Sequence, residues 1–226
     1  MIPDFFKALK ELGLKTFTLI LVGKIYNRAF DFTYGLDTKP HLDQIKAMKQ
    51  GLRLDQTFNS SKYSDSSLLA LRKLFSSLNL KPENTFLDIG CGKGIVLIAA
   101  LEQNLKKIKG FDHSQYLCNI ASNNCSAYQR KLDKIITLEI NCLSGDGYEF
   151  EDDEDILYFY NPFSEKTTEN FITSIEESLA RNRRDILIIT HKWPGKDSVL
   201  ERLKPSSKRR YIFWGKTFDV FQINPT

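Results

Sequence analysis

The chain has 226 residues, of which 42% are hydrophobic and 27% are charged, so it is long enough to bury one substantial core. Its formal net charge is only +4, which does not predict a nucleic-acid-binding protein. It contains no run of about 20 apolar residues, and we therefore expect no transmembrane helix.

Residues 1–60 precede the region of alternating strand and helix patterns and are predicted to form an N-terminal helical extension or lid. The stretch Phe17–Val22 is apolar, but charges lie on both sides and no small-residue cleavage site follows, so a signal peptide fits poorly. An amphipathic helix that packs on the domain is the preferred interpretation. A peripheral contact of this helix with a membrane surface stays open as the alternative.

Residues 61–226 have the pattern of one α/β domain. Ser64 or Asp65 is expected to cap a helix that runs to Leu78, and Ser114 a helix over residues 115–132. Strands alternate with helices, which is typical of a doubly wound, Rossmann-like sheet, and two consecutive final strands predict an antiparallel hairpin. Further helices are predicted over residues 94–104 and 164–182, and the seven strands over residues 85–90, 107–112, 134–140, 155–160, 185–192, 209–215 and 217–223.

The cysteine and histidine content argues against a metal site. The four cysteines form no CxxC pair, and the chain has only three histidines. We expect no metal, and we expect free thiols in a reducing, cytoplasmic compartment. The cysteines are Cys91, Cys118, Cys125 and Cys142.

The stretch FLDIGCGKGIVLIAA, Phe86–Ala100, places glycines between two apolar segments. Gly90, Gly92 and Gly94 allow a tight strand-to-helix turn that a ligand can approach closely. Their GxGxG spacing differs from the GxGxxG dinucleotide fingerprint, and the stretch lacks a Walker A motif. Asp88 would repel a phosphate at this turn, whereas it would attract an ammonium group.

A second acidic residue, Asp112, ends the next predicted strand, 18 residues after Gly94. An acid in that position accepts hydrogen bonds from the hydroxyls of a ribose. A nucleoside with a cationic amino-acid tail fits both acids, and S-adenosyl-L-methionine is such a molecule. We therefore predict S-adenosyl-L-methionine as the cofactor.

The segments FLDIGCGKG, GFDHS and FYNPF resemble the class I S-adenosyl-L-methionine-dependent methyltransferase family, from about Ser61 to the C-terminus. Members of that family end their sheet with an inserted antiparallel hairpin, which fits the two final strands. YGLDT at Tyr34–Thr38, together with GCGKG and YNPF, is similar to a group of small bacterial methyltransferases whose substrates are largely unassigned.

The resemblance implies roles for individual residues in cofactor binding. Asp88 would order the methionine end, and Asp112 would bind the ribose. Asn141 takes the place of an acid that contacts the adenine amino group, with Cys142 beside it and Asp146 as a rival. Tyr63 would cover the methionine end or simply pack on the domain. The implied cofactor-binding residues are Tyr63, Asp88, Gly90, Cys91, Gly92, Gly94, Asp112, His113, Asn141 and Cys142.

The segment YNPF follows the fourth predicted strand and resembles the [ND]PP[YF] motif of amino-methyltransferases, with one proline missing. By that resemblance, the Asn161 side chain and the Pro162 carbonyl would hold an acceptor amine, and the Phe163 ring would stack on the substrate or stabilise the sulfonium. The alternative is a loop shaped by Asn-Pro with Phe163 in the core. His191, at the end of the fifth strand, is the candidate general base, with a structural histidine as the alternative.

The predicted function is transfer of a methyl group from S-adenosyl-L-methionine to an unidentified acceptor, either a protein lysine or other amine, or a small molecule. The alternative from another class is a binding module that keeps this fold without turnover. The GxGxG spacing and Asp88 both argue against an NAD-dependent oxidoreductase. Nucleic acid is not an expected partner, and the oligomeric state stays open.

Overall fold

The computed structural model describes residues 13–39, 66–145, 148–160, 165–191 and 200–224. Its strands are β1 (Thr85–Ile89), β2 (Lys107–Asp112), β3 (Thr137–Cys142), β4 (Glu154–Tyr160), β5 (Ile186–His191), β6 (Ser207–Phe213) and β7 (Lys216–Ile223).

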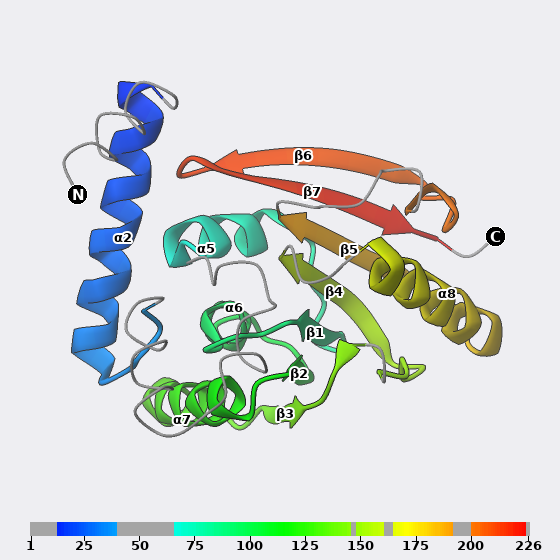
Figure 1. Cartoon of the computed structure of the whole chain (residues 1–226), viewed down its shortest axis with the longest axis horizontal. Helices are drawn as coiled ribbons and strands as arrows, with labels where there is room; N and C mark the ends of the chain where they lie inside the picture. Colours follow the sequence, from blue (N-terminus) through cyan, green and yellow to red (C-terminus); the bar gives the residue numbers. More distant parts are fainter. Residues whose placement is uncertain (1–12, 40–65, 146–147, 161–164, 192–199, 225–226) are drawn as a thin grey trace.

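These strands form one seven-stranded sheet in the order β3-β2-β1-β4-β5-β7-β6 (Figure 1). β1 to β5 pair in parallel, whereas β7 runs antiparallel between β5 and β6. The arrangement confirms the predicted doubly wound, Rossmann-like sheet with a C-terminal antiparallel hairpin. Because the strand order reverses beside β1, the carboxyl ends of β1, β2 and β4 border the crevice in which such sheets bind ligands.

The helices lie on both faces of the sheet. They are α2 (Leu14–Tyr34), α5 (Leu68–Ser77), α6 (Ile95–Leu101), α7 (Gln115–Leu132) and α8 (Glu165–Arg181). α5, α6 and α7 share a buried cluster with one face of the sheet, and α8 contributes to a second cluster on the other face. The chain changes face after β3, so both faces of the sheet are covered, as in a doubly wound fold.

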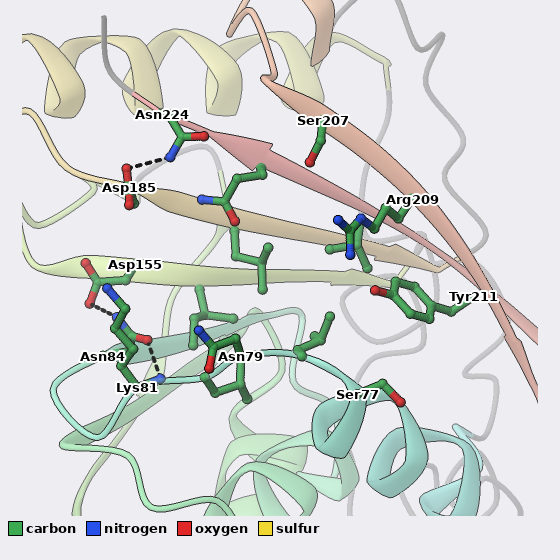
Figure 2. A pocket seen from close by; sticks show the side chains of 16 residues that line it. Ser77, Asn79, Lys81, Asn84, Asp155, Asp185, Ser207, Arg209, Tyr211 and Asn224 are labelled. Carbon is green, nitrogen blue, oxygen red and sulfur yellow. Dashed lines mark hydrogen bonds between the residues drawn. The ribbon is translucent and has the colours of Figure 1, made fainter.

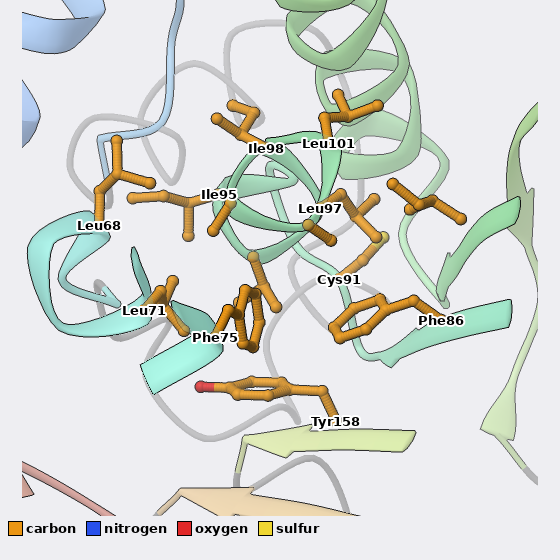
Figure 3. Close-up of a cluster of buried hydrophobic side chains, with 14 of the residues drawn as sticks. Leu68, Leu71, Phe75, Phe86, Cys91, Ile95, Leu97, Ile98, Leu101 and Tyr158 are labelled. Carbon is orange, nitrogen blue, oxygen red and sulfur yellow. The ribbon is translucent and has the colours of Figure 1, made fainter. Parts of the chain in front are cut away.

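Successive side chains of the central strands point to opposite faces of the sheet and so belong to two different cores. Phe86 of β1 and Tyr158 of β4 point toward α5 and α6, where Phe86 meets Phe75 at a ring distance of 5.5 Å (Figure 3). Leu87 and Leu157, one position along, belong to the opposite core with α8. Successive residues of these strands are therefore buried on both sides, which explains their nearly continuous apolar sequence.

The N-terminal extension is described in part, and that part packs on the domain. The amide of Asn27 in α2 donates to the carbonyl of Ser66 at 2.8 Å and accepts from the Leu68 N–H at 3.0 Å. A Cβ at Gly23 would lie 2.8 Å from Oγ of Ser67, so this glycine permits the close approach of α2 to α5. α2 also contacts α7, and its N-terminal half meets the β6-β7 turn at Gly215.

Several element boundaries differ from the sequence prediction by one to three residues, and two of these differences have a clear local reason. The N-cap of α5 is Ser67, not Ser64 or Asp65, because the Ser67 hydroxyl accepts from the Ala70 N–H at 3.4 Å. β3 begins at Thr137 rather than at residue 134, because Asp133 ends α7 in a left-handed conformation and the next residues must turn back. The Ser114 cap of α7 is confirmed, with its hydroxyl accepting from the Leu117 N–H.

Among the described residues, no helix combines the length and hydrophobicity that crossing a bilayer requires. The same residues include no group of three or more side chains suited to a metal ion. All four cysteines are free thiols.

Candidate functional site

The turn between β1 and α6 has the conformation that its glycines predict. Gly90, Gly92 and Gly94 have φ values of 78°, 52° and 83°, and residues with a Cβ rarely adopt this backbone conformation. A Cβ at Gly94 would also lie 3.0 Å from the Cys125 sulfur and 3.2 Å from the Ala121 Cβ. The turn therefore needs glycine for its backbone conformation and for its close contact with α7.

Hydrogen bonds attach this turn to the carboxyl end of β2. The N–H groups of Gly90 and Cys91 donate to the carbonyl of Phe111 at 3.0 and 2.9 Å. The Cys91 side chain is buried in the core, and burial raises the pKa of its thiol well above the usual range. A neutral, buried thiol packs as a small hydrophobic group. Any cofactor contact of Cys91 would thus come from its main chain.

Asp88, at the carboxyl end of β1, is a buried carboxyl group with an unsatisfied oxygen. Its exposed fraction is 2%, and its Oδ2 has no hydrogen-bond partner among the described residues. Burial raises the pKa of Asp88 well above the ordinary range, and the charge of Asp112 adds to that shift. A buried acid without a partner is costly, and a cationic ligand would supply the missing charge. The residue thus fits the ammonium group of S-adenosyl-L-methionine.

Asp112, at the end of β2, is held in place by two main-chain groups. Its Oδ2 accepts from the Gly92 N–H and its Oδ1 from the Ser114 N–H, both at 3.0 Å. Each carboxylate oxygen can accept a second hydrogen bond, so the group keeps acceptor capacity for ribose hydroxyls. The same contacts link the glycine turn, the end of β2 and the start of α7.

The predicted adenine-side residues lie next to Asp112. Asn141 and Cys142 are the last residues of β3, where Asn141 is paired with Phe111 and Cys142 with Asp112 in the parallel register. Both are exposed, and the Cys142 thiol lies 3.7 Å from the carbonyl oxygen of His113. The fold therefore brings Asp112, His113, Asn141 and Cys142 to one sheet edge. Their contact with adenine stays a prediction.

Five of the predicted residues are not among those that the structure describes. Tyr63, the rival adenine acid Asp146, and the acceptor-site residues Asn161, Pro162 and Phe163 fall outside the described residues. Their proposed roles stay predictions that follow from the sequence.

His191, the candidate base, is buried at the end of β5. Its ring lies between Tyr160 and Phe218, at ring distances of 4.7 and 4.9 Å. Its Nδ1 is 2.6 Å from the carbonyl oxygen of Thr217, which can only accept, so Nδ1 carries the proton. Nε2 of the neutral ring is then the basic nitrogen. The arrangement orients the imidazole firmly and also suits a purely structural role.

Lys93, within the glycine turn, is buried and pairs with an acid. Its side chain is 1% exposed, and its Nζ lies 3.1 Å from Oδ1 of Asp37. The amide of Asn124 in α7 donates to the carbonyls of both Asp37 and Lys93, at 2.9 and 3.0 Å, and accepts from the Asp37 N–H at 2.9 Å. These contacts attach the YGLDT segment, at the end of α2, to the glycine turn.

We expect Asp37→Asn to weaken S-adenosyl-L-methionine binding about tenfold and to lower the free energy of unfolding by about 1–3 kcal/mol. The substitution removes the negative charge beside the buried Lys93 ammonium and loosens the glycine turn. Calorimetric titration and urea denaturation would measure the two effects. Glu176→Gln, in a surface pair with Arg202, is the matched control and should change neither. Equal affinity of Asp37→Asn and the unmodified protein would refute a positioning role for Asp37.

A groove of 510 Å³ lies at the opposite edge of the sheet (Figure 2). Asn84 and Asp155, near the amino ends of β1 and β4, line it together with Asp185 and Asn224. Both acids already accept hydrogen bonds, Asp155 from Asn84 at 3.3 Å and Asp185 from Asn224 at 2.8 Å. The groove therefore lies at the other end of the strands from the glycine turn.

Solved structures with a similar fold are methyltransferases. An RNA methyltransferase from Salinibacter ruber, crystallised with S-adenosyl-L-homocysteine, is 14% identical with a TM-score of 0.54, over 71% of this chain and 94% of its own. A Nostoc punctiforme protein assigned as an O-methyltransferase is 15% identical with a TM-score of 0.54, over 69% of this chain and 56% of its own. A Methanococcus maripaludis protein assigned as an S-adenosyl-L-methionine-dependent methyltransferase has a TM-score of 0.51 at 14% identity, over 70% of this chain and 85% of its own.

Comparison with curated protein sequences gives no match. A family model described as histone methylation protein DOT1 matches residues 43–155, which is half of the chain. The fold and these similarities define a class I methyltransferase whose cofactor is S-adenosyl-L-methionine. Within that class, the chain belongs to the family of histone methylation protein DOT1.

Proposed function

We propose that this enzyme transfers the methyl group of S-adenosyl-L-methionine to an amine on a protein, with a lysine side chain as the acceptor. The observation that carries cofactor binding is the buried Asp88, whose Oδ2 has no partner among the described residues. The family description names histone methylation, and this supports a protein acceptor over a small molecule. In this proposal, residues 61–226 form the catalytic domain and residues 1–60 form an extension of it.

Residues at the carboxyl edge of the sheet would each bind a different part of the cofactor. Asp88 would receive the ammonium group, and the glycine turn would leave room for the main body of the ligand. Asp112, held by the Gly92 and Ser114 N–H groups, would accept from the ribose hydroxyls. His113, Asn141 and Cys142 would border the adenine, where Asn141 offers an amide oxygen to the exocyclic amine.

When bound, S-adenosyl-L-methionine supplies an electrophilic methyl group on a sulfonium, and alignment and exclusion of water dominate such a displacement. Asn161 and the Pro162 carbonyl would orient the acceptor nitrogen, and Phe163 would face the sulfonium. A lysine ammonium must lose a proton before its nitrogen can act as a nucleophile. His191, with Nδ1 fixed by Thr217, would take that proton on Nε2.

Two further points of the proposal concern where the protein works. The four free cysteines support a reducing cytoplasm. The similarity of YGLDT, GCGKG and YNPF to small bacterial enzymes supports a bacterial source.

Calorimetric titration with S-adenosyl-L-methionine, with NAD as the control ligand, would test the cofactor. Micromolar binding of the former and none of the latter is expected, about −8 kcal/mol at 1 μM. Incubation of a core-histone mixture with methyl-labelled S-adenosyl-L-methionine would test the acceptor. The histones should incorporate label, and prior chemical methylation of their lysines should abolish this incorporation. Binding without label transfer to any protein would favour the alternative of a module without turnover.

A further inference from the structure

The outer face of α2 is the main concentration of exposed large hydrophobic side chains in the described residues. Outside α2, the described chain exposes only Ile135 and Ile212 in this way. A soluble domain rarely leaves such a patch open unless something binds there. The exposed fractions are 72% for Leu14, 44% for Leu21, 40% for Val22, 58% for Ile25 and 92% for Phe32.

These side chains form one continuous stripe. Leu14, Leu21, Ile25 and Phe32 are separated by seven, four and seven positions, which places them on one side of an α-helix. The buried residues of α2 lie on the opposite side, against the domain. At 1.5 Å per residue, the stripe is about 27 Å long. α5 and α7 pack on the inner face of α2, which lies at one side of the described part of the molecule (Figure 1). Among the described residues, the outer stripe is exposed.

The exposed charged side chains of α2 itself are all positive. Lys15, Lys24 and Arg28 are exposed on α2. The only acidic residue of the helix, Asp31, is buried on the inner side, where its carboxylate accepts from the Thr38 hydroxyl at 2.8 Å. The outer face of α2 is therefore apolar along its centre and cationic at its margins.

We propose that the outer face of α2 binds the surface of an anionic lipid bilayer, with the helix lying in the interface. An interfacial helix buries an apolar stripe among the acyl chains and places Lys and Arg among anionic headgroups, which is the arrangement seen here. A second copy of the same face would instead bring cations against cations, so charge complementarity disfavours self-association. The proposal is independent of the acceptor and of the cofactor site.

Vesicle co-sedimentation of the full chain would test the proposal, with vesicles of phosphatidylcholine alone and of phosphatidylcholine with an equal amount of phosphatidylglycerol. We expect the protein to sediment with the anionic vesicles, weakly with the neutral ones, and less at high salt, which screens the charges. Ile25→Ser/Phe32→Ser should lower partitioning into anionic vesicles by about tenfold or more. Lys24→Gln/Arg28→Gln should reduce the preference for anionic lipid.

The matched control is Ile135→Ser/Ile212→Ser, which removes the two exposed isoleucines outside α2 and should bind vesicles as the unmodified protein does. Circular dichroism and calorimetric S-adenosyl-L-methionine binding would show that each variant is folded. The proposal is overturned if the unmodified protein sediments with neither vesicle, or if the Ile25/Phe32 variant binds equally well. A dimer in light scattering that this variant converts to a monomer would overturn it in favour of a second copy.

Discussion

Replacing Asp88 by Asn should weaken S-adenosyl-L-methionine binding by about a hundredfold, which corresponds to about 2.7 kcal/mol. The substitution keeps the shape of the side chain and removes its charge. Asp88 is 2% exposed, and its Oδ2 lacks a partner among the described residues, so the ammonium of the cofactor would be its counter-charge. An ion pair in such a water-poor position is worth more than one at the surface. Calorimetric titration would measure the loss.

The same variant should stabilise the free protein at neutral pH. Burial raises the pKa of Asp88 well above the ordinary range, so the folded chain binds this proton more tightly than the unfolded chain. The resulting contribution to stability is present at low pH and is lost as pH rises from the unfolded pKa through the folded pKa. Asn has no proton to lose at neutral pH, so Asp88→Asn avoids this loss of stability and should raise Tm. Over the same pH interval, the affinity of the unmodified protein for the cofactor should increase, because the carboxylate is the binding form.

Asp133→Asn is the control for this experiment. Asp133 is exposed at the end of α7, and Asn tolerates its left-handed backbone conformation. This variant should bind the cofactor normally and keep its Tm. An Asp88→Asn protein that binds as tightly as the unmodified chain would show that Asp88 does not contact the ammonium group.

Lys109→Met should lower the free energy of unfolding by about 3–5 kcal/mol, the usual effect of leaving a buried charge without its partner. The Lys109 side chain is 3% exposed in β2 and pairs with Glu154 of β4, whose side chain is 0% exposed. Lys109 also contacts Glu151 at 2.8 Å, and the Tyr148 hydroxyl donates to Glu154. Without the lysine, the carboxylate of Glu154 would remain buried with only neutral donors.

The stability of Lys109→Met should also depend on pH in a specific way. Burial already raises the pKa of Glu154, and Lys109 opposes that shift. Loss of the lysine should raise this pKa further, so the stability deficit of Lys109→Met should shrink as pH falls and Glu154 becomes protonated. The double variant Lys109→Met/Glu154→Gln should recover part of the loss at neutral pH. Urea denaturation at several pH values would measure these changes.

Lys107→Met is the matched control, because Lys107 lies two positions earlier on the same strand. Its side chain is 17% exposed and pairs with Glu139 at 3.1 Å, close to solvent. We expect a loss of less than about 1 kcal/mol. If Lys109→Met costs no more than this control, the buried pair is not a major source of stability.

Much of the candidate site could be predicted from the sequence because it depends on local features. The glycine turn between Asp88 and α6, the strand that ends at Asp112 and the Ser114 cap each follow from neighbouring residues. The class of fold followed from alternating strand and helix patterns, and the sheet order confirms it. Turn conformation, strand burial and helix capping involve residues a few positions apart, so short sequence patterns are enough to predict them.

Contacts between distant segments, by contrast, became known only from the folded structure. The Lys93–Asp37 pair spans 56 positions, and the Asn124 contact with Asp37 spans 87. From the sequence, Lys93 could face outward or pair with an acid, and the fold places Asp37 of YGLDT beside it. Likewise, the sequence of α2 is apolar on both sides, and only docking onto α5 and α7 shows which side is covered. Burial depends on what the rest of the chain places nearby. The sequence thus determined the turn, the acids and the strand pattern, whereas the fold decided which charges pair and which apolar face stays exposed.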